Sequence, residues 1–165
     1  MRKIDLPLDK KIIKSLKIGE WVLLSGRLLT ARDAAHKRLV DVLKNGKKLP
    51  ISIKGEAIYY TGPTPARGKE VIGACGPTTS ARMDPFTPAL LRHGLIAMIG
   101  KGERAKEVAV SIKKYGAVYF VTIGGAGAYL SERVNSSAVV AYSDLETEAI
   151  RELIVEDFPA IVAIK

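Results

Sequence analysis

Residues 95–123 read LIAMIGKGERAKEVAVSIKKYGAVYFVTI and indicate the fold class of this chain. The apolar runs at residues 95–99 and 117–123 are typical of buried strands, whereas residues 103–115 repeat apolar side chains at the spacing of a helix. A strand, a helix and a second strand of these lengths favour a right-handed crossover with the two strands parallel. The stretch therefore predicts a fold of the α/β or mixed α+β class.

A further strand and helix are predicted on the N-terminal side of this unit. After an N-terminal arm, residues 20–30 read as an apolar strand with a bulge or turn at residues 25–26. A helix is expected to start from an N-cap at Asp33 and to end at the Asn-Gly pair at residues 45–46. These elements extend the mixed pattern toward the start of the chain.

The remaining segments carry shorter and weaker signals. We expect antiparallel strand pairs early in the chain and parallel pairs later, with no internal repeat. The remaining predictions are short strands at 56–61 and 70–75, a helix with Thr87 as N-cap and Pro88 in its first turn, a short helix after the glycines at 124–127, and further mixed elements at 138–142, 146–155 and 160–164.

Length and composition predict one soluble globular domain spanning residues 1–165. The chain is 47% hydrophobic and 26% charged, which is typical of a folded protein with a real core. Its N-terminal segment has no apolar run of signal-peptide length, and no stretch approaches the ~20 apolar residues that cross a bilayer. We therefore expect a cytoplasmic protein that does not bind a membrane.

The formal net charge of +9 favours a polyanion, an anionic substrate or an acidic protein partner. The lysine and arginine pairs are scattered along the chain and no aromatic residues interleave with them, which does not favour a nucleic-acid stacking platform. A basic binding module for polyanions nevertheless stays an alternative. One cysteine, Cys75, excludes an internal disulfide, and with two histidines the chain has no recognisable Cys/His metal site.

Three glycine-containing turns, GACGPTTSAR, MIGKGE and TIGGAGA, each follow a predicted strand. Ligands in such sheets collect at the carboxyl ends of the strands, so these turns are expected at one edge. The glycines of IGKG allow the backbone to approach a ligand, and Lys101 adds a positive charge suited to a carboxylate or phosphate. Taken alone, each turn is better explained as a change of chain direction than as a binding site. Complete nucleotide-binding motifs are absent.

The stretch GPTTSARMD, residues 76–84, places hydroxyl groups next to a guanidinium. Its hydroxyls could simply cap a helix that starts near Ser80. If the segment is helical, Arg82 lies one turn beyond Thr78, where it could bind a carboxylate bidentately while Thr78 faces the substrate. An unassisted threonine is a poor base, so this second interpretation requires a nearby cation or proton relay.

A second basic stretch, LLTARDAAHKR at residues 28–38, surrounds the predicted helix start. Exposed cations at a helix N-terminus oppose the helix dipole at a cost of roughly 0.3–1 kcal/mol each, which suggests a function for Arg32. Local neutralisation of Arg32 by Asp33 is the alternative. For His36 on an amphipathic helix, a structural role is favoured and a catalytic one stays open.

Six stretches of the chain form an ordered set: ARDAAHKR (31–38), YYTGP (59–63), GPTTSARMD (76–84), IGKG (99–102), GGAGA (124–128) and VEDFPA (155–160). In this order they resemble the β subunit, or fused C-terminal domain, of the iron–sulfur hydro-lyases that include class I fumarate hydratase and L-tartrate dehydratase. The resemblance implies a swivelling β/β/α domain, with a mixed sheet flanked by helices. It also implies reversible hydration of a four-carbon dicarboxylate, with fumarate to malate as the preferred reaction.

Carried over residue by residue, the resemblance makes Thr78 the catalytic base. Arg32 and Arg82 would bind substrate carboxylates, and Lys101 corresponds to the family's substrate-binding lysine. TARD stands where many members have GRD, and GGAGA where many have GGAAA, which affects local backbone geometry and not the charged groups.

The resemblance also implies an incomplete active site. A [4Fe-4S] cluster would be ligated by a partner α subunit, this chain would supply no metal ligand, and it would be active only with that partner. The residues do not separate fumarate from tartrate or another hydroxy-diacid. A homodimer and a dimer of αβ pairs both stay open, as does a scaffold domain that lost the chemistry.

Overall fold

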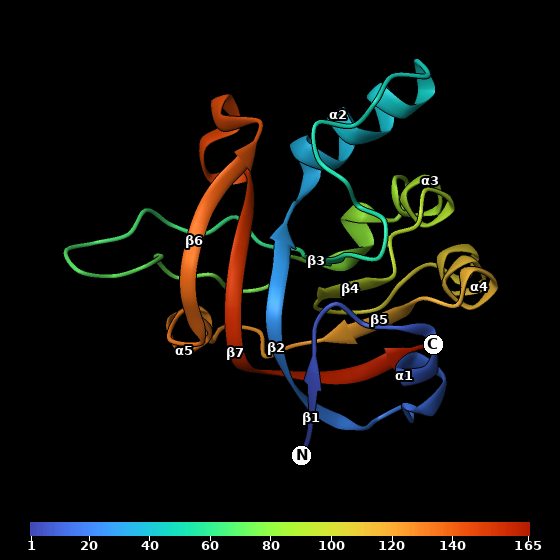
Figure 1. Cartoon of the computed structure of the whole chain (residues 1–165), viewed down its shortest axis with the longest axis horizontal. Coiled ribbons are helices and arrows are strands. Elements are labelled where there is room, and N and C mark those ends of the chain that lie inside the picture. The colour runs from blue at the N-terminus through green and yellow to red at the C-terminus, as the bar shows by residue number, and fades with distance from the viewer.

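The computed structural model describes residues 1–165, and all of its strands belong to one sheet (Figure 1). The strands are β1 (Arg2–Asp5), β2 (Trp21–Thr30), β3 (Ala57–Tyr59), β4 (Ala97–Gly100), β5 (Val118–Val121), β6 (Val134–Ala141) and β7 (Ile150–Ile164). The α-helices are α1 (Lys10–Ser15), α2 (Asp33–Lys44), α3 (Thr87–Arg92), α4 (Lys106–Tyr115) and α5 (Gly127–Ser131), with 3-10 helices η1 (Ser80–Met83) and η2 (Ser143–Glu148). The mixed α+β class is confirmed.

The seven-stranded sheet has the order β1-β2-β3-β4-β5-β7-β6. The neighbours from β1 to β5 are all parallel, and the antiparallel pairs all involve the C-terminal strand β7. The expected order, antiparallel early and parallel later, is therefore wrong. The physical reason is that a helix connects each successive pair of strands up to β5, and a helical crossover returns the chain in the same direction.

Strand β7 closes part of the sheet into a barrel. Besides its antiparallel pairs with β5 and β6, β7 pairs with β2, so that β2, β3, β4, β5 and β7 form a closed ring. The bulge predicted in β2 is confirmed as a register shift between Leu24 and Gly26. Gly26 has φ +121, and a Cβ there would lie 2.7 Å from the carbonyl oxygen of Leu6, so the N-terminal segment requires this glycine.

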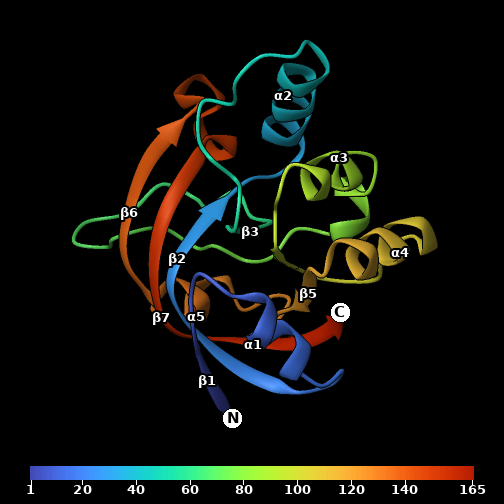
Figure 2. The ribbon, with the colours of Figure 1, turned by 45° about the vertical axis from the view of Figure 1, so that its right-hand side comes forward.

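The parallel strands are buried on both faces because two hydrophobic cores flank them. Successive side chains of a strand point to opposite faces, so Tyr59 and Ile99 pack inside the barrel while Ile58 and Met98 pack beneath the helices. Figure 2 shows α2, α3 and α4 on the same side of the sheet. The outer core thus fixes these helices over the strands whose ends carry the candidate site.

Several predicted elements differ from the structure in position. The N-terminal arm contains β1 and α1. The helix caps are each one residue off, since Arg32 precedes α2 and Phe86 precedes α3. Strand β7 joins two segments that were predicted separately. No helix has the length and apolar character that a membrane crossing requires.

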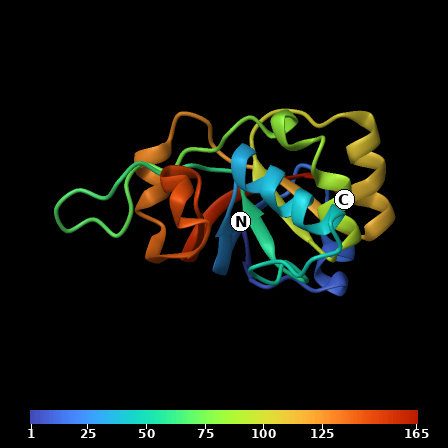
Figure 3. The ribbon, with the colours of Figure 1, turned by 90° about the horizontal axis from the view of Figure 1, so that it is seen from above.

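The strand predicted at residues 70–75 is wrong. The chain between β3 and η1 leaves the sheet as a long loop that projects away from the barrel (Figure 3). Within it, Gly73 N–H donates to Thr64 O at 3.1 Å and Thr64 N–H donates to Ala74 O at 3.0 Å, so the segment pairs with its own loop. Val71 is exposed, whereas Ile72 and Cys75 of the same segment are buried in one of the two cores.

Candidate functional site

The carboxyl ends of four parallel strands meet at one edge of the sheet. Arg32 follows β2, Lys101 follows β4, and the GGAGA turn follows β5. The GPTTS segment does not directly follow a strand, contrary to the sequence prediction, because residues 70–75 form a loop. It reaches the same edge through backbone hydrogen bonds.

These hydrogen bonds attach Thr78 and its neighbours to the ends of β3 and β4. Thr78 N–H donates to Tyr60 O at 2.7 Å, and Ser80 N–H donates to Lys101 O at 2.9 Å. Lys101 N–H in turn approaches Thr78 O at 3.4 Å, and an isolated parallel bridge places Thr79 directly opposite Lys101. The segment therefore continues the sheet by one short strand-like pairing, with Thr78 and Lys101 on adjacent backbones.

Ser80 anchors this segment from below. It is fully buried, and its hydroxyl lies 2.8 Å from the Tyr119 hydroxyl, which is also 2.8 Å from Gly102 O. A carbonyl oxygen can only accept, so Tyr119 donates its single proton to Gly102 and Ser80 donates to Tyr119. Burial raises the pKa of Tyr119 to about 12, which keeps that donor protonated. A Cβ at Gly100 would lie 2.0 Å from Ser80 Oγ, so this approach requires glycine.

Arg104 forms a buried hub next to Ser80 and Tyr119. Its side chain is 0% exposed and donates from Nε to Asp84 at 2.7 Å and from Nη2 to Thr87 at 2.8 Å. Its guanidinium lies 4.9 Å from the centre of the Tyr119 ring. Asp84 also accepts from Ala105 N–H at 2.8 Å. Arg104 thus connects the loop after Lys101 to the segment after Arg82. Sequence reasoning missed this role because, in the sequence, a buried arginine cannot be told from one that faces solvent.

The two predicted arginines converge on one carboxylate. Arg82 donates to Asp33 from Nε at 3.0 Å and from Nη2 at 2.7 Å, in bidentate geometry. Arg32 Nε lies 3.6 Å from the same carboxylate and 3.4 Å from Glu148 Oε1. The expectation that Asp33 neutralises Arg32 locally is therefore only part of the arrangement, since Asp33 pairs more closely with Arg82.

Arg32 lies in a narrow slot beside the end of β3. A Cβ at Gly62 would lie 2.8 Å from both Cδ and Nη1 of Arg32, so only glycine leaves room for this side chain. The Nε atom is buried and has no hydrogen bond. Arg82, by contrast, is 51% exposed at the rim.

His36 supports this corner from inside helix α2. Its Nδ1 lies 2.9 Å from Arg32 O, and its ring meets the Tyr60 ring edge-on with centroids 5.2 Å apart. The pKa of His36 is lowered to about 4, chiefly by burial and in part by the charge of Arg104, against the opposing effects of the hydrogen bond to Arg32 O and the charge of Asp33. His36 is therefore a neutral, buried side chain behind Arg32, with a structural contact to the backbone.

The turn that precedes Thr78 packs against the GGAGA turn that follows β5. Cys75 N–H donates to Gly127 O at 3.1 Å, and a Cβ at Gly127 would lie 2.9 Å from Gly76 N. A Cβ at Gly124 would lie 3.7 Å from Lys101 Cδ, so the Lys101 side chain runs past this turn. All three predicted turns thus meet at one edge. The chain has no group of three His, Cys, Asp or Glu side chains that could hold a metal ion.

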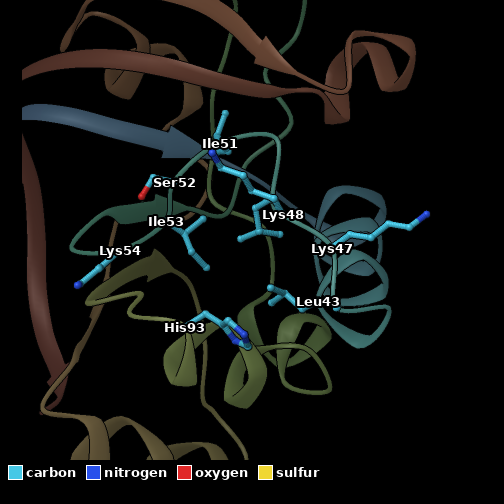
Figure 4. Close-up of a pocket in the computed structure, with 10 residues that line it drawn as sticks. Leu43, Lys47, Lys48, Ile51, Ser52, Ile53, Lys54 and His93 are labelled. Carbon is cyan, nitrogen blue, oxygen red and sulfur yellow. The ribbon is translucent and has the colours of Figure 1, made fainter.

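The site is an open rim, and the cavity shown in Figure 4 lies elsewhere. That cavity has a volume of about 420 Å³ and lies at the C-terminal ends of α2 and α3, the opposite end of α2 from Arg32. None of the four predicted residues lines it. Figure 4 shows the ammonium ends of Lys47 and Lys54 pointing away from its apolar lining.

Comparison with known proteins gives one consistent result. The family model described as Fumarase C-terminus matches residues 1–165. The chain is 36% identical over 168 aligned residues to "Fumarate hydratase 2" of Leishmania major, covering 98% of this chain and 30% of that protein. It is 37% identical to "Fumarate hydratase class I, anaerobic" of Escherichia coli (strain K12), covering 98% of this chain and 31% of that protein.

A third relative matches along most of its own length. "Putative L(+)-tartrate dehydratase subunit beta" of Methanocaldococcus jannaschii is 38% identical, over 94% of this chain and 83% of that protein. The chain therefore spans about 30% of the length of the fumarate hydratases but 83% of this subunit. With the full-length match to the family model, these similarities show that the chain belongs to the Fumarase C-terminus family.

Proposed function

We propose that this chain is the β-subunit type half of an iron–sulfur hydro-lyase and folds as a single domain. The proposed reaction is reversible hydration of a four-carbon dicarboxylate, with fumarate to malate preferred and L-tartrate dehydration as the alternative. Relatives named as fumarate hydratases and as a tartrate dehydratase β subunit support both. The observation that carries the proposal is the gathering of Thr78, Lys101 and two arginines at one open edge.

In this proposal Thr78 is the catalytic base and moves a proton at its Oγ. The proposal also places the ammonium group of Lys101 near the Thr78 hydroxyl, which the pairing of the Lys101 backbone with the Thr78 segment supports. A nearby cation favours the deprotonated form of a hydroxyl, which meets the requirement that an unassisted threonine cannot satisfy. Lys101 also contributes to substrate binding.

Arg32 and Arg82 would bind the two ends of the dicarboxylate. Asp33 already occupies the Nε and Nη2 positions of Arg82 and fixes the plane of its guanidinium. A guanidinium held in one plane loses less rotational freedom on binding a carboxylate, so substrate binding is pre-organised. Both ends of a four-carbon diacid would thus be positioned before proton transfer occurs.

The residues of this chain do not fit an iron–sulfur cluster. Such clusters are bound by cysteine thiolates, and the chain has the single Cys75, which is buried. Burial raises the pKa of the Cys75 thiol to about 11, so its thiolate is disfavoured. We therefore assign the [4Fe-4S] cluster to a partner α subunit. This partner would cover the open rim and complete the site.

The test is co-expression with a cysteine-bearing α subunit, followed by anaerobic assay with fumarate and L-tartrate. The chain alone is expected to be inactive and the complex active. In the complex, Thr78→Ala should lower kcat by roughly 10²- to 10⁴-fold without raising KM strongly. Thr79→Ala, which removes the neighbouring hydroxyl, is the matched control and should keep most of the activity. Activity of the isolated chain, or equal activity of the two variants, would reject these assignments.

A further inference from the structure

We propose that Glu148, the last residue of η2, is a positioning residue that orients the guanidinium of Arg32 toward a substrate carboxylate. No sequence motif singled out this residue. The inference rests on the proposed function, because it gives Arg32 a substrate to bind. It adds η2 to the elements that determine substrate affinity.

The Glu148 carboxylate contacts both Arg32 and the start of helix α2. Its Oε1 lies 3.4 Å from Arg32 Nε and accepts a hydrogen bond from Ala34 N–H at 3.2 Å. The Ala34 amide is one of the free donors in the first turn of α2, where a negative charge is also favoured by the helix dipole. One carboxylate oxygen is therefore fixed relative to the helix that Arg32 precedes.

Arg32 is enclosed on its other side by the loop after β3. The Gly62 backbone lies against Cδ and Nη1 of Arg32, and a Cβ at Gly62 would also lie 3.2 Å from Thr147 O in η2. The side chain is 27% exposed, and its buried Nε faces Glu148 and Asp33. Nε lies within ion-pair distance of the two carboxylates without a hydrogen bond to either, and no hydrogen bond within the chain occupies the terminal nitrogens, which are left for a ligand.

The segment that carries Glu148 is itself tied to α2. Arg38 donates to Asp144 from Nη1 at 2.8 Å and from Nη2 at 2.5 Å, and its guanidinium lies 5.3 Å from the centre of the Tyr142 ring. Tyr142 and Glu146 have positive φ values, 54 and 53, which are uncommon for residues other than glycine. Such backbone conformations persist only where surrounding contacts enforce them. The segment is therefore held in one conformation, as positioning requires.

The substitution Glu148→Gln removes the charge and keeps the size of the side chain. In the assembled hydro-lyase, KM for the dicarboxylate should rise about tenfold, because the Arg32 guanidinium loses its orientation. The value of kcat should change little, because Thr78 keeps its position. Glu148→Asp should recover part of the affinity. Glu146→Gln is the matched control, since Glu146 lies in the same segment, is exposed and has no ion pair.

A second measurement on the full chain does not depend on activity. The Nε–H proton of Arg32, followed by NMR, should exchange with solvent faster in Glu148→Gln than in the wild type, and at the wild-type rate in Glu146→Gln. An unchanged exchange rate, or an unchanged KM in an active complex, would overturn the positioning role. If the wild-type complex were inactive, the proposed function would fail, and the exchange rate would still decide for or against the contact between Glu148 and Arg32.

Discussion

Arg82 and Asp33 are joined by two parallel hydrogen bonds at the rim of the sheet edge, although 49 residues separate them in the chain. The pair links η1 to the first turn of α2. The Arg82 side chain is 51% exposed and that of Asp33 is 33% exposed, so solvent screens their attraction. Such a pair contributes little to folding, and its value lies in fixing the direction of an arginine.

Arg82→Lys is therefore expected to separate binding from stability. The variant keeps the charge but loses the bidentate fork, so KM of the assembled enzyme should rise about tenfold or more. The free energy of unfolding of the chain should change by less than about 1 kcal/mol, as for other exposed ion pairs. Denaturant titration and steady-state kinetics measure the two effects. Arg92→Lys, an exposed arginine of α3 without an ion pair, is the control, and a similar KM in both variants would contradict the assignment.

The close approach of Ser80 to Gly100 leads to a second prediction. In Gly100→Ala the new methyl group would lie 2.0 Å from Ser80 Oγ and 2.8 Å from Tyr60 Cδ2, inside van der Waals contact. The Thr78 segment must move, so we expect a loss of roughly 1–3 kcal/mol of stability together with most of the activity. Gly124→Ala is the control, because its methyl group would meet only Lys101 Cδ, at 3.7 Å. Equal melting temperatures for the two variants would show that the segment is not packed as described.

The elements with strong local signals are the ones that the sequence predicted correctly. Residues 95–123 do form a strand, a helix and a parallel strand, because periodicity and length are properties of the segment itself. The same holds for α2, whose Gly46 adopts a positive φ directly after the helix. The edge rule for parallel strands also anticipated that the IGKG and GGAGA turns would lie together.

Strand pairing could not be predicted in the same way, because it depends on contacts between distant segments. The closure of the barrel by β7 leaves no periodic pattern in residues 150–164. The error at residues 70–75 has a similar origin, since Val71 and Ile72 are β-branched and fit a strand, whereas the neighbouring Gly73 and Ala74 hydrogen-bond to Thr64 within the loop. The helix between β2 and β3 did carry usable information, because it implies a parallel crossover.

The residues that support the site were missed for a related reason. Arg104, Asp84 and Glu148 are charged side chains whose partners lie far away in the chain or in another element. In the sequence they cannot be told from charges that face solvent. Only the fold shows that Arg104 is fully buried.

The buried pair of Arg104 and Asp84 gives a third prediction. Asp84→Asn leaves the Arg104 charge without its partner in a side chain that is 0% exposed, which should lower the free energy of unfolding by about 3–5 kcal/mol. Asp144→Asn breaks the exposed pair with Arg38 and should have a much smaller effect. Chemical denaturation of both variants measures the contrast. Comparable losses would mean that burial does not decide the contribution of these pairs.

The buried His36 predicts how stability depends on pH. Its pKa falls from 6.5 to about 4 on folding, chiefly because burial disfavours the imidazolium. Between these two values the unfolded chain binds a proton that the folded chain does not, so acidification favours unfolding. The contribution is fully present above about pH 6.5 and is lost as pH falls toward 4, by up to about 3 kcal/mol. Measured unfolding free energies of the wild type should therefore fall more steeply in this range than those of His36→Phe, and parallel curves would show that His36 titrates normally.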